Sequence, residues 1–481
     1  MIGETRLKAA LLGSGAAIAL LASPAVADEV TDLKAQIDAL QNRLDQLEVQ
    51  QTKIASEQVA PAQAITAGEF PGSIKLGETS LALSGYVKLD AIYTMGAPGD
   101  PAVGGIGDSF VLSNIPADGS FNDNRDDDIR LHARQSRFRI DSRTPTEWGS
   151  LRTRIEGDFF GGGGNQNFSN SNGFRLRHAW GSLGPVLFGQ TWSTFMDQDA
   201  FFDTIDFAGA TGAEFVRQAQ IRYTADMGNG LSADVAVENP EFRDITTTGA
   251  ATANNIDKVP DLVGALRYRQ DWGAVNFTVL GRHLTYDNGL GQEDSTWGYG
   301  LHGGVTVNVF GKDSISGVFN WGDGMGRYFA GNGGLINEAV VTCSTPQFVS
   351  STGGNPSPTG TSHLAFFAPG CGADLHTQTS WGGWGGYAHT WTDTLRSNII
   401  YGYSRAEWDT SLLRGAAFGR IEEWQSLHVN LMWSPVPKVT FGIEYMQGWI
   451  DTVDLNRTFA VGTDDDANKA RVQLGMQVNF P

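Results

Sequence analysis

The stretch LALSGYVKLDAIY, residues 81–93, alternates apolar and polar side chains with a period of two. Its polar face carries Ser84, Lys88 and Asp90, and its apolar face carries Leu81, Leu83, Val87, Leu89, Ala91 and Tyr93. This pattern is typical of a transmembrane β-barrel strand, although a strand in a soluble β-sandwich alternates in the same way. The number of such strands and the lengths of their connections must decide between the two.

Fifteen further segments follow the same pattern. The full set spans 81–93, 129–143, 150–159, 174–183, 186–191, 216–225, 230–238, 261–270, 273–286, 296–309, 312–321, 380–391, 394–405, 424–433, 438–449 and 471–480. Short connections such as GP at 184–185 alternate with long ones such as 94–128, 239–260 and 322–379. This arrangement predicts an all-β fold, a 16-stranded antiparallel transmembrane barrel over residues 80–481 with both ends in the periplasm.

The overall composition excludes some partners. The chain has 481 residues and a formal net charge of −19. A nucleic-acid partner is not expected, because binding to phosphates requires a basic surface. No segment after the N-terminus is long and apolar enough for a transmembrane helix, so we expect no helical membrane anchor after export.

The N-terminus resembles an export signal. Arg6 and Lys8 precede an apolar stretch from Ala9 to Ala22, and residues 25–27 read Ala-Val-Ala. The stretch is too short to span a bilayer, and the small residues match a cleavage pattern. We therefore expect residues 1–27 to be a signal peptide and the protein to reach the outer membrane of a Gram-negative bacterium.

Residues 28–58 predict a helix with a heptad repeat. Its apolar positions are Val30, Leu33, Ile37, Leu40, Leu44, Leu47 and Ile54. So narrow an apolar stripe needs a partner helix, and the simplest partner is the same helix from another subunit. A single helix lying on its own domain is the alternative, and the heptads do not choose between dimer and trimer. Residues 59–79 are expected to be a linker.

Arginine is concentrated in the second, third and fourth predicted strands. Residues 130–177 hold nine arginines and no lysine, and a β-bulge near Gln135–Ser136 would keep them on one face. Because arginine on the lipid face costs about 2–4 kcal/mol near the midplane, this face should line the pore. The expected pore-lining residues are Arg130, Arg134, Arg137, Arg139, Arg152, Arg154, Arg175 and Arg177. Alternatively, these arginines pair with neighbouring acids and only stiffen the barrel.

Four stretches closely resemble the DcaP-like outer-membrane porins. They are FPGSIKL…LSGYVKLDAIY (70–93), RLHARQSRFRIDSRTPTEWGSLRTRIEGDFFG (130–161), GFRLRHAWGSLGPVLFGQTWSTFMD (173–197) and FVRQAQIRYT (215–224). The resemblance implies a homotrimer with a periplasmic coiled coil, which takes up dicarboxylates and other small anions through an arginine-rich constriction. Pro481 departs from the aromatic residue that usually ends such barrels.

The connection 192–215 is the expected constriction loop, by analogy with sixteen-stranded porins. It carries Asp197, Asp199, Asp203 and Asp206. If these acids faced the arginines, a transverse field would cross the pore and orient anions. We therefore expect passive, anion-preferring diffusion within outer-membrane lipid and lipopolysaccharide. A phosphate- or sugar-selective porin is the alternative.

Other chemistry receives little support from the sequence. The GDSF stretch at 107–110 resembles the start of an esterase motif around Ser109, but no companion motif follows, so we expect no enzyme. We expect no cofactor and no metal site, and we interpret the acidic runs 126–128 and 464–466 as solvated loops. We expect Cys343 and Cys371 to form a disulfide, because an exported protein permits one and it would close a loop that has no obvious core of its own. Two free thiols are the alternative.

Overall fold

The computed structural model describes residues 24–58, 66–96, 108–116, 126–162, 165–241, 245–247, 250–251, 256–287, 293–328, 339–343, 373–409, 420–453 and 466–480. The chain divides into two units, residues 1–66 and 67–481, which are described separately below. The expected signal peptide lies almost wholly outside the described residues.

The described part of the first unit is one helix, α1 (Pro24–Gln58). Leu33, Ile37, Leu40, Leu44 and Leu47 of the heptad are all exposed, with 48–65% of each residue accessible. A helix of this kind is marginal in water when nothing covers its apolar stripe. No helix among the described residues is sufficiently long and apolar to span a membrane.

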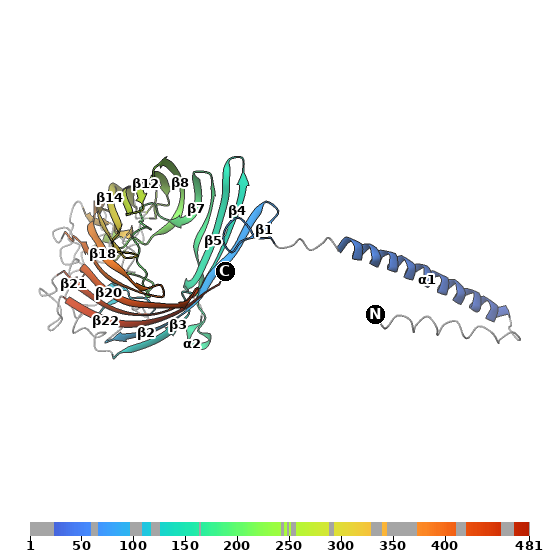
Figure 1. Ribbon diagram of the computed structural model, residues 1–481. Helices are drawn as coiled ribbons and strands as arrows, with labels where there is room; N and C mark the ends of the chain where they lie inside the picture. Colours follow the sequence, from blue (N-terminus) through green and yellow to red (C-terminus); the bar gives the residue numbers. More distant parts are fainter. Residues whose placement is uncertain are drawn as a thin grey trace, which may run out of the picture. The chain divides into compact units, whose positions relative to one another are not determined.

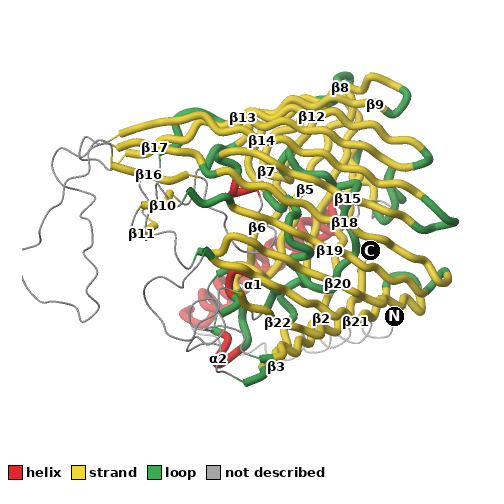
Figure 2. The backbone as a smooth tube through the Cα atoms, turned by 90° about the vertical axis from the view of Figure 1, so that its left-hand side faces the viewer, coloured by secondary structure: helices red, strands yellow, loops and turns green. Residues whose placement is uncertain are grey.

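The second unit is built from antiparallel strands (Figure 1). Its wall consists of β2 (Thr79–Met95), β3 (Asp128–His132), β4 (Arg137–Thr146), β5 (Gly149–Gly161), β6 (Gly173–Leu183), β7 (Val186–Trp192), β8 (Arg217–Gly228), β9 (Leu231–Glu238), β12 (Asp261–Gln270), β13 (Gly273–Asp287), β14 (Glu293–Asn308), β15 (Ser314–Asp323), β18 (Thr379–Thr392), β19 (Leu395–Ala406), β20 (Ile421–Val436), β21 (Val439–Thr452) and β22 (Asp466–Phe480). Figure 2 shows neighbouring strands running side by side along this wall.

The wall closes because β2 pairs with strands from both ends of the sequence. Gly85 lies opposite Phe480 of β22, and on its other edge β2 pairs with β3 and then β4. β3 and β4 are two halves of one strand, interrupted at residues 133–136, where the bulge was expected. When β3 and β4 are counted as one strand, the described wall is a closed barrel of sixteen strands. This confirms the predicted fold.

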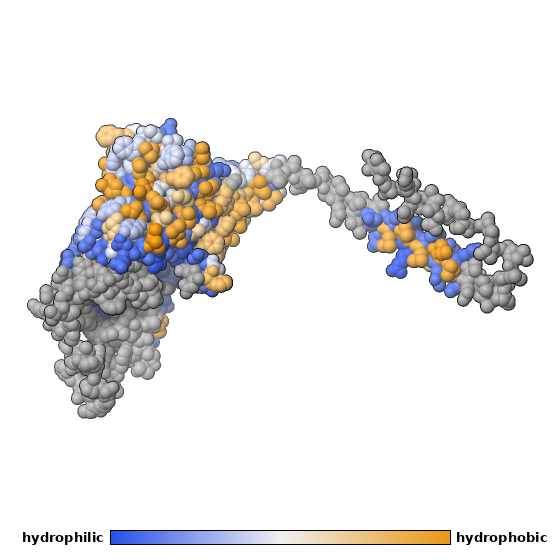
Figure 3. Space-filling view, turned by 90° about the horizontal axis from the view of Figure 1, so that it is seen from below, coloured by the Kyte–Doolittle hydropathy of each residue, from blue (hydrophilic) through white to orange (hydrophobic). Residues whose placement is uncertain are grey.

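Alternation places polar side chains inside the barrel and apolar ones outside. Along β2, Lys88 and Asp90 are buried, whereas Val87 and Leu89 are exposed. Along β14, His302 is buried between exposed neighbours on either side. Figure 3 shows apolar residues gathered over the strands on the face that it presents. A soluble sandwich would bury its apolar face, whereas an exposed apolar face with a polar interior is the pattern of transmembrane β-barrels.

Several short elements lie outside the wall. β1 (Ile74–Leu76) pairs with the start of β2, α2 (Gln166–Ser169) follows β5, and Leu112–Asn114 form a 3₁₀ turn. A separate small sheet contains β10 (Ile245–Thr247), β11 (Ala250–Ala251), β16 (Ala339–Cys343) and β17 (Ala373–Thr377). These four strands were not predicted, because they lie in connections without a period of two.

Candidate functional site

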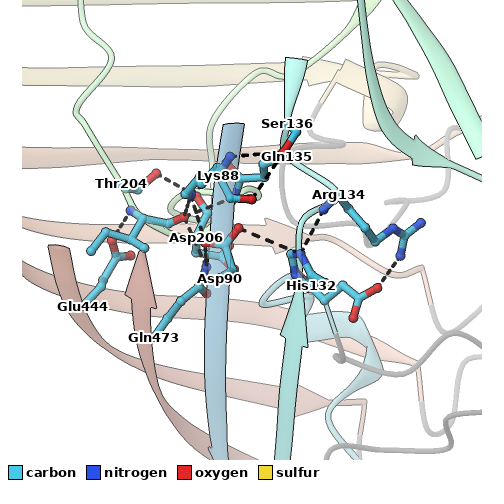
Figure 4. A network of polar contacts seen from close by, with 12 residues as sticks. Lys88, Asp90, His132, Arg134, Gln135, Ser136, Thr204, Asp206, Glu444 and Gln473 are labelled. Atoms are coloured by element: carbon cyan, nitrogen blue, oxygen red, sulfur yellow. Dashed lines mark hydrogen bonds and ion pairs between the residues drawn. The ribbon is translucent and has the colours of Figure 1, made fainter. Parts of the chain in front are cut away.

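The segment 193–216 joins β7 to β8, and Figure 4 shows its residues Thr204 and Asp206 beside Lys88 of β2, Glu444 of β21 and Gln473 of β22. The residue between them, Ile205, anchors the segment to this wall. The Ile205 carbonyl accepts hydrogen bonds from Lys88 Nζ at 2.7 Å, and from Gln135 and Gln473, both at 3.2 Å. Its N–H donates to the carboxylate of Glu444 on β21. Because the donors are buried polar side chains, each broken contact would leave an unsatisfied group.

The same segment is also anchored on other strands of the wall. The Thr211 N–H donates to Ser426 on β20 at 3.0 Å, and Asn320 on β15 donates to the Gly212 carbonyl at 3.1 Å. Asn398 and Asn430 both donate to the Asp203 carbonyl, at 2.9 and 2.8 Å. One segment can contact β2, β15, β20 and β21 together only from within the barrel. It therefore lies inside the barrel, as expected of a constriction loop.

Interior glycines let the segment approach the wall closely. A Cβ on Gly402 of β19 would lie 2.1 Å from the Thr211 carbonyl oxygen, and one on Gly442 of β21 would lie 2.4 Å from Ile205 Cδ1. Any larger residue at these positions would displace the segment or the strand.

Five of the predicted arginines, which lie on β4, β5 and β6, form ion pairs with three carboxylates on β4 and β5. Their closest N···O distances are 2.8 Å for Arg139–Asp141, 2.7 Å for Arg154–Asp141, 3.3 Å for Arg137–Glu156, 2.8 Å for Arg177–Glu156, 2.8 Å for Arg175–Asp158 and 2.9 Å for Arg177–Asp158. Pairing with neighbouring acids therefore occurs, but the guanidinium groups outnumber the carboxylates. The cluster keeps an excess of positive charge.

The other three predicted arginines differ from this cluster. Arg130 pairs with Asp128 at 2.7 Å and lies 3.8 Å from Asp108, and Arg134 pairs with Asp108. These two positive charges are therefore matched by two negative ones. Arg152, in contrast, is exposed, and among the described residues no carboxylate forms an ion pair with it.

Arg217 and Arg222 on β8 are two further arginines that the sequence did not predict as pore-lining residues. The guanidinium carbon of Arg217 lies 4.7 Å from the ring centre of Trp192, and neither arginine has a described carboxylate within 4.0 Å. They were overlooked because they are separated in sequence from the arginine-rich stretch. Arg217 lies near the cluster, because Arg175, Arg177 and Asp158 are close enough to act on it electrostatically. Arg222 lies further along β8, opposite Leu187, where Glu238 is the carboxylate that acts on it.

The four loop aspartates do not face the predicted arginines, so this part of the expectation is wrong. Asp197 lies 3.9 Å from His302 on β14 and Asp199 pairs with Arg269 on β12 at 2.7 Å. Asp203 pairs with Arg396 on β19 at 3.0 Å, and Asp206 lies 3.6 Å from Arg471 on β22. Burial raises the pKa of the Asp206 carboxyl, and Arg471 opposes that rise. The acids turn toward the walls that anchor the segment, and Phe207 faces the arginines instead.

A second segment, residues 108–116, also packs within the barrel. The Phe110 N–H donates to Asp206 at 2.9 Å, and Trp424 Nε1 donates to Ser113 at 3.0 Å. Leu112 is fully buried, and a Cβ on Gly448 of β21 would lie 2.4 Å from its side chain. This segment belongs to the 94–128 connection and contains Ser109.

The family comparison agrees with this geometry. Residues 71–476 match the model of the porin subfamily. The chain belongs to the porin subfamily. Membership confirms the resemblance drawn from the sequence, and it identifies an outer-membrane porin rather than an enzyme, which leaves the Ser109 esterase alternative without support.

Individual porins are related to this one at low identity. Porin Omp2b of Brucella canis is 26% identical over 279 residues, which cover 56% of this chain and 64% of Omp2b. Omp2b of Brucella melitensis is 28% identical over 144 residues, covering 29% of this chain and 40% of that porin. The outer membrane channel DcaP of Acinetobacter baumannii shares the fold, with a TM-score of 0.63 at 21% identity over 86% of this chain and all of DcaP.

The expected disulfide and the two acidic runs concern residues that are only partly described in the structure of this porin. Cys371 is not among them, and of Cys343 only the backbone, at the end of β16, is described. Of the acidic runs, 126–128 is described, as is Asp466. Within the described part of the chain, no group of three His, Cys, Asp or Glu side chains is arranged to hold a metal ion.

Proposed function

We propose that this porin is a passive diffusion pore that prefers small anions, dicarboxylates in particular. The proposal rests mainly on the excess of guanidinium groups over carboxylates on β4, β5 and β6, to which Arg152 and Arg217 add further positive charge. An uncompensated cluster of one sign in a narrow, low-dielectric passage raises the local concentration of ions of the opposite sign. The planar fork of arginine also suits the two oxygens of a carboxylate.

The experiment is a measurement of ion selectivity in planar bilayers for R152A/R154A. We expect the reversal potential in a KCl gradient to shift toward cations, because two positive charges leave the proposed pore lining. R405A/K75A removes the same charge elsewhere: Arg405 lies on the outward-facing side of β19 and Lys75 is exposed on β1. An unchanged potential in R152A/R154A, or an equal shift in both double variants, would contradict the assignment.

Solute preference needs a separate measurement. In a liposome-swelling series, succinate should enter faster than a neutral sugar of similar size, because it carries two groups that arginine binds. Faster entry of phosphate or sugar would favour the alternative pores named above.

We also propose that α1 joins three subunits in the periplasm through its heptad stripe, together with contacts between barrel walls in the lipid and lipopolysaccharide of the outer membrane. The exposed Leu33, Ile37, Leu40, Leu44 and Leu47 support an assembly of this kind. The exposed apolar side chains on the outside of the barrel support the lipid contact. In this proposal residues 1–27 direct export and residues 59–79 link helix to barrel.

A further inference from the structure

Two phenylalanines of the interior segment lie against the arginines of β6 and β8. The ring centre of Phe207 is 5.1 Å from the guanidinium carbon of Arg175 and 5.7 Å from that of Arg177. The ring centre of Phe215 is 5.5 Å from the guanidinium carbon of Arg217. Guanidinium groups at these distances from aromatic rings are attracted by the electrons of the ring face. The segment therefore presents an aromatic surface to the arginines.

Phe207 also connects the segment with the arginine-bearing wall. Its ring stacks on Phe160 of β5 with a centre separation of 4.3 Å and an interplanar angle of 22°. Arg134 and Arg175 lie 4.8 and 5.5 Å from the Phe160 ring centre. Phe160 and Phe207 therefore lie directly beside the guanidinium groups of Arg134 and Arg175.

The arginines next to the rings keep the capacity to bind a solute. No described carboxylate lies within 4.0 Å of Arg217, and Arg175 shares Asp158 with Arg177 while 31% of its side chain stays exposed. Arginine has five N–H donors, so one carboxylate partner leaves several of them free.

An apolar cavity of about 90 Å³ lies on the segment beside the same two rings. The side chains that define its character are Phe202, Phe207, Ala210, Ala213, Phe215 and Trp384. Phe202 and Trp384 meet edge to face at 5.3 Å, and both alanines are buried. The cavity has room for a group of a few carbon atoms, and it has no charged side chain in its lining.

The anchoring of the segment keeps this arrangement in place. Ile205, two residues before Phe207, has its carbonyl held by three side-chain donors, and Thr211 is bonded to Ser404 and Ser426. The rings and the cavity are thus carried by backbone that is fixed on both sides of Phe207.

We propose that Phe207 and Phe215, with the cavity behind them, form a subsite for anions that carry a short apolar body. The carboxylate would bind Arg175 and Arg217 while the body lies against the rings and in the cavity. This inference rests on the proposed anion pathway and adds a preference within it. Compact anions such as acetate would use only the arginines.

The test compares acetate with isovalerate, a monocarboxylate with a branched apolar body, as blockers of chloride conductance in planar bilayers. In the wild-type protein isovalerate should block at lower concentration, because each buried methylene is worth about a fourfold gain in affinity. F207A should abolish most of this difference while acetate block changes little. F207L, which keeps apolar bulk, should retain part of it. F168A is the matched control, because Phe168 lies on α2 with 90% of the residue exposed.

The outcomes separate this inference from the proposed function. If chloride is preferred over potassium but isovalerate and acetate block equally in the wild type, the subsite is refuted and the anion pathway stands. If F207A weakens both blockers equally, Phe207 only narrows the passage and the subsite is refuted. If chloride is not preferred in the wild type, the anion pathway itself fails. Heat-modified migration on gels establishes that each variant is folded.

Discussion

Lys88 is a buried cation that anchors the interior segment to β2. Its ammonium group contacts Gln135 at 2.8 Å, the Ile205 carbonyl at 2.7 Å and Asp90 at 3.0 Å, and it is almost fully buried. K88M keeps the length of the side chain but leaves the Asp90 carboxylate buried without its cation. Breaking a buried pair in this way costs about 3–5 kcal/mol. We expect a lower thermal midpoint of unfolding and noisier single-channel currents.

K312M is the matched control for K88M. Lys312 pairs with Asp393 at 2.7 Å, but its side chain is 70% exposed and that of Asp393 is 90% exposed. Exposed pairs contribute little to stability, so K312M should resemble the wild type. Equal behaviour of the two variants would show that Lys88 does not hold the segment.

Asp313, in the turn between β14 and β15, predicts a dependence of stability on pH. A hydrogen bond from Tyr387 is the main cause, with further bonds from the Thr390 N–H and His389, and together they lower the pKa of Asp313 to about 2. Because the folded-state pKa lies below the ordinary value of 3.8, the stabilisation is complete above about pH 4 and is lost as pH falls toward 2. D313N should therefore unfold more easily than the wild type at pH 7, with the difference vanishing near pH 2. A difference that persists at pH 2 would contradict this origin.

At the scale of elements, the 108–116 segment reduces the positive charge that the arginines present to the pore. Asp108 contacts both Arg130 and Arg134. D108N removes this negative charge while keeping the shape of the side chain, so the reversal potential should shift toward greater chloride preference. D127N is the control, because it removes the same charge from a residue that has other partners. Asp127 accepts hydrogen bonds from Tyr93 and from the Gly96 N–H, the latter at 2.7 Å. A shift as large in D127N as in D108N would show that surface charge alone is responsible.

The wall strands could be predicted from the sequence, whereas the contacts of the interior segment could not. Alternation in the neighbourhood of Lys88 or Arg139 is local, because lipid outside and water inside impose it on each strand separately. The partners of Asp199 and Asp203 are Arg269 and Arg396, which lie 70 and 193 residues away. Such pairs depend on barrel closure and on the path of the segment, and no local pattern encodes either.

The short strands within the long connections were not predicted, because they too lack a clear local pattern. β10 and β16 pair in parallel although they are about ninety residues apart in sequence, as in Ile245 opposite Ala339. They are only three and five residues long. A segment of this length cannot display a period of two clearly enough to be recognised.

At the scale of the whole molecule, assembly should depend on the heptad stripe of α1. L40K places a charge at a d position of the proposed seam, where it would be buried between helices. We expect the oligomer on unheated gels to weaken or disappear while the barrel stays folded. N42K changes a position outside the stripe and should leave the oligomer intact. An unchanged oligomer in L40K would show that the barrel walls suffice for assembly.

We infer that this acidic chain forms a pore that prefers anions because guanidinium groups outnumber carboxylates in the cluster on β4, β5 and β6. The formal net charge of −19 would by itself favour cations near the protein. The most direct test is the zero-current potential of the wild-type protein in a planar bilayer between two KCl concentrations. We predict a potential whose sign is set by chloride and whose magnitude falls as total salt rises. A potential of zero, or one with the sign set by potassium, would contradict it.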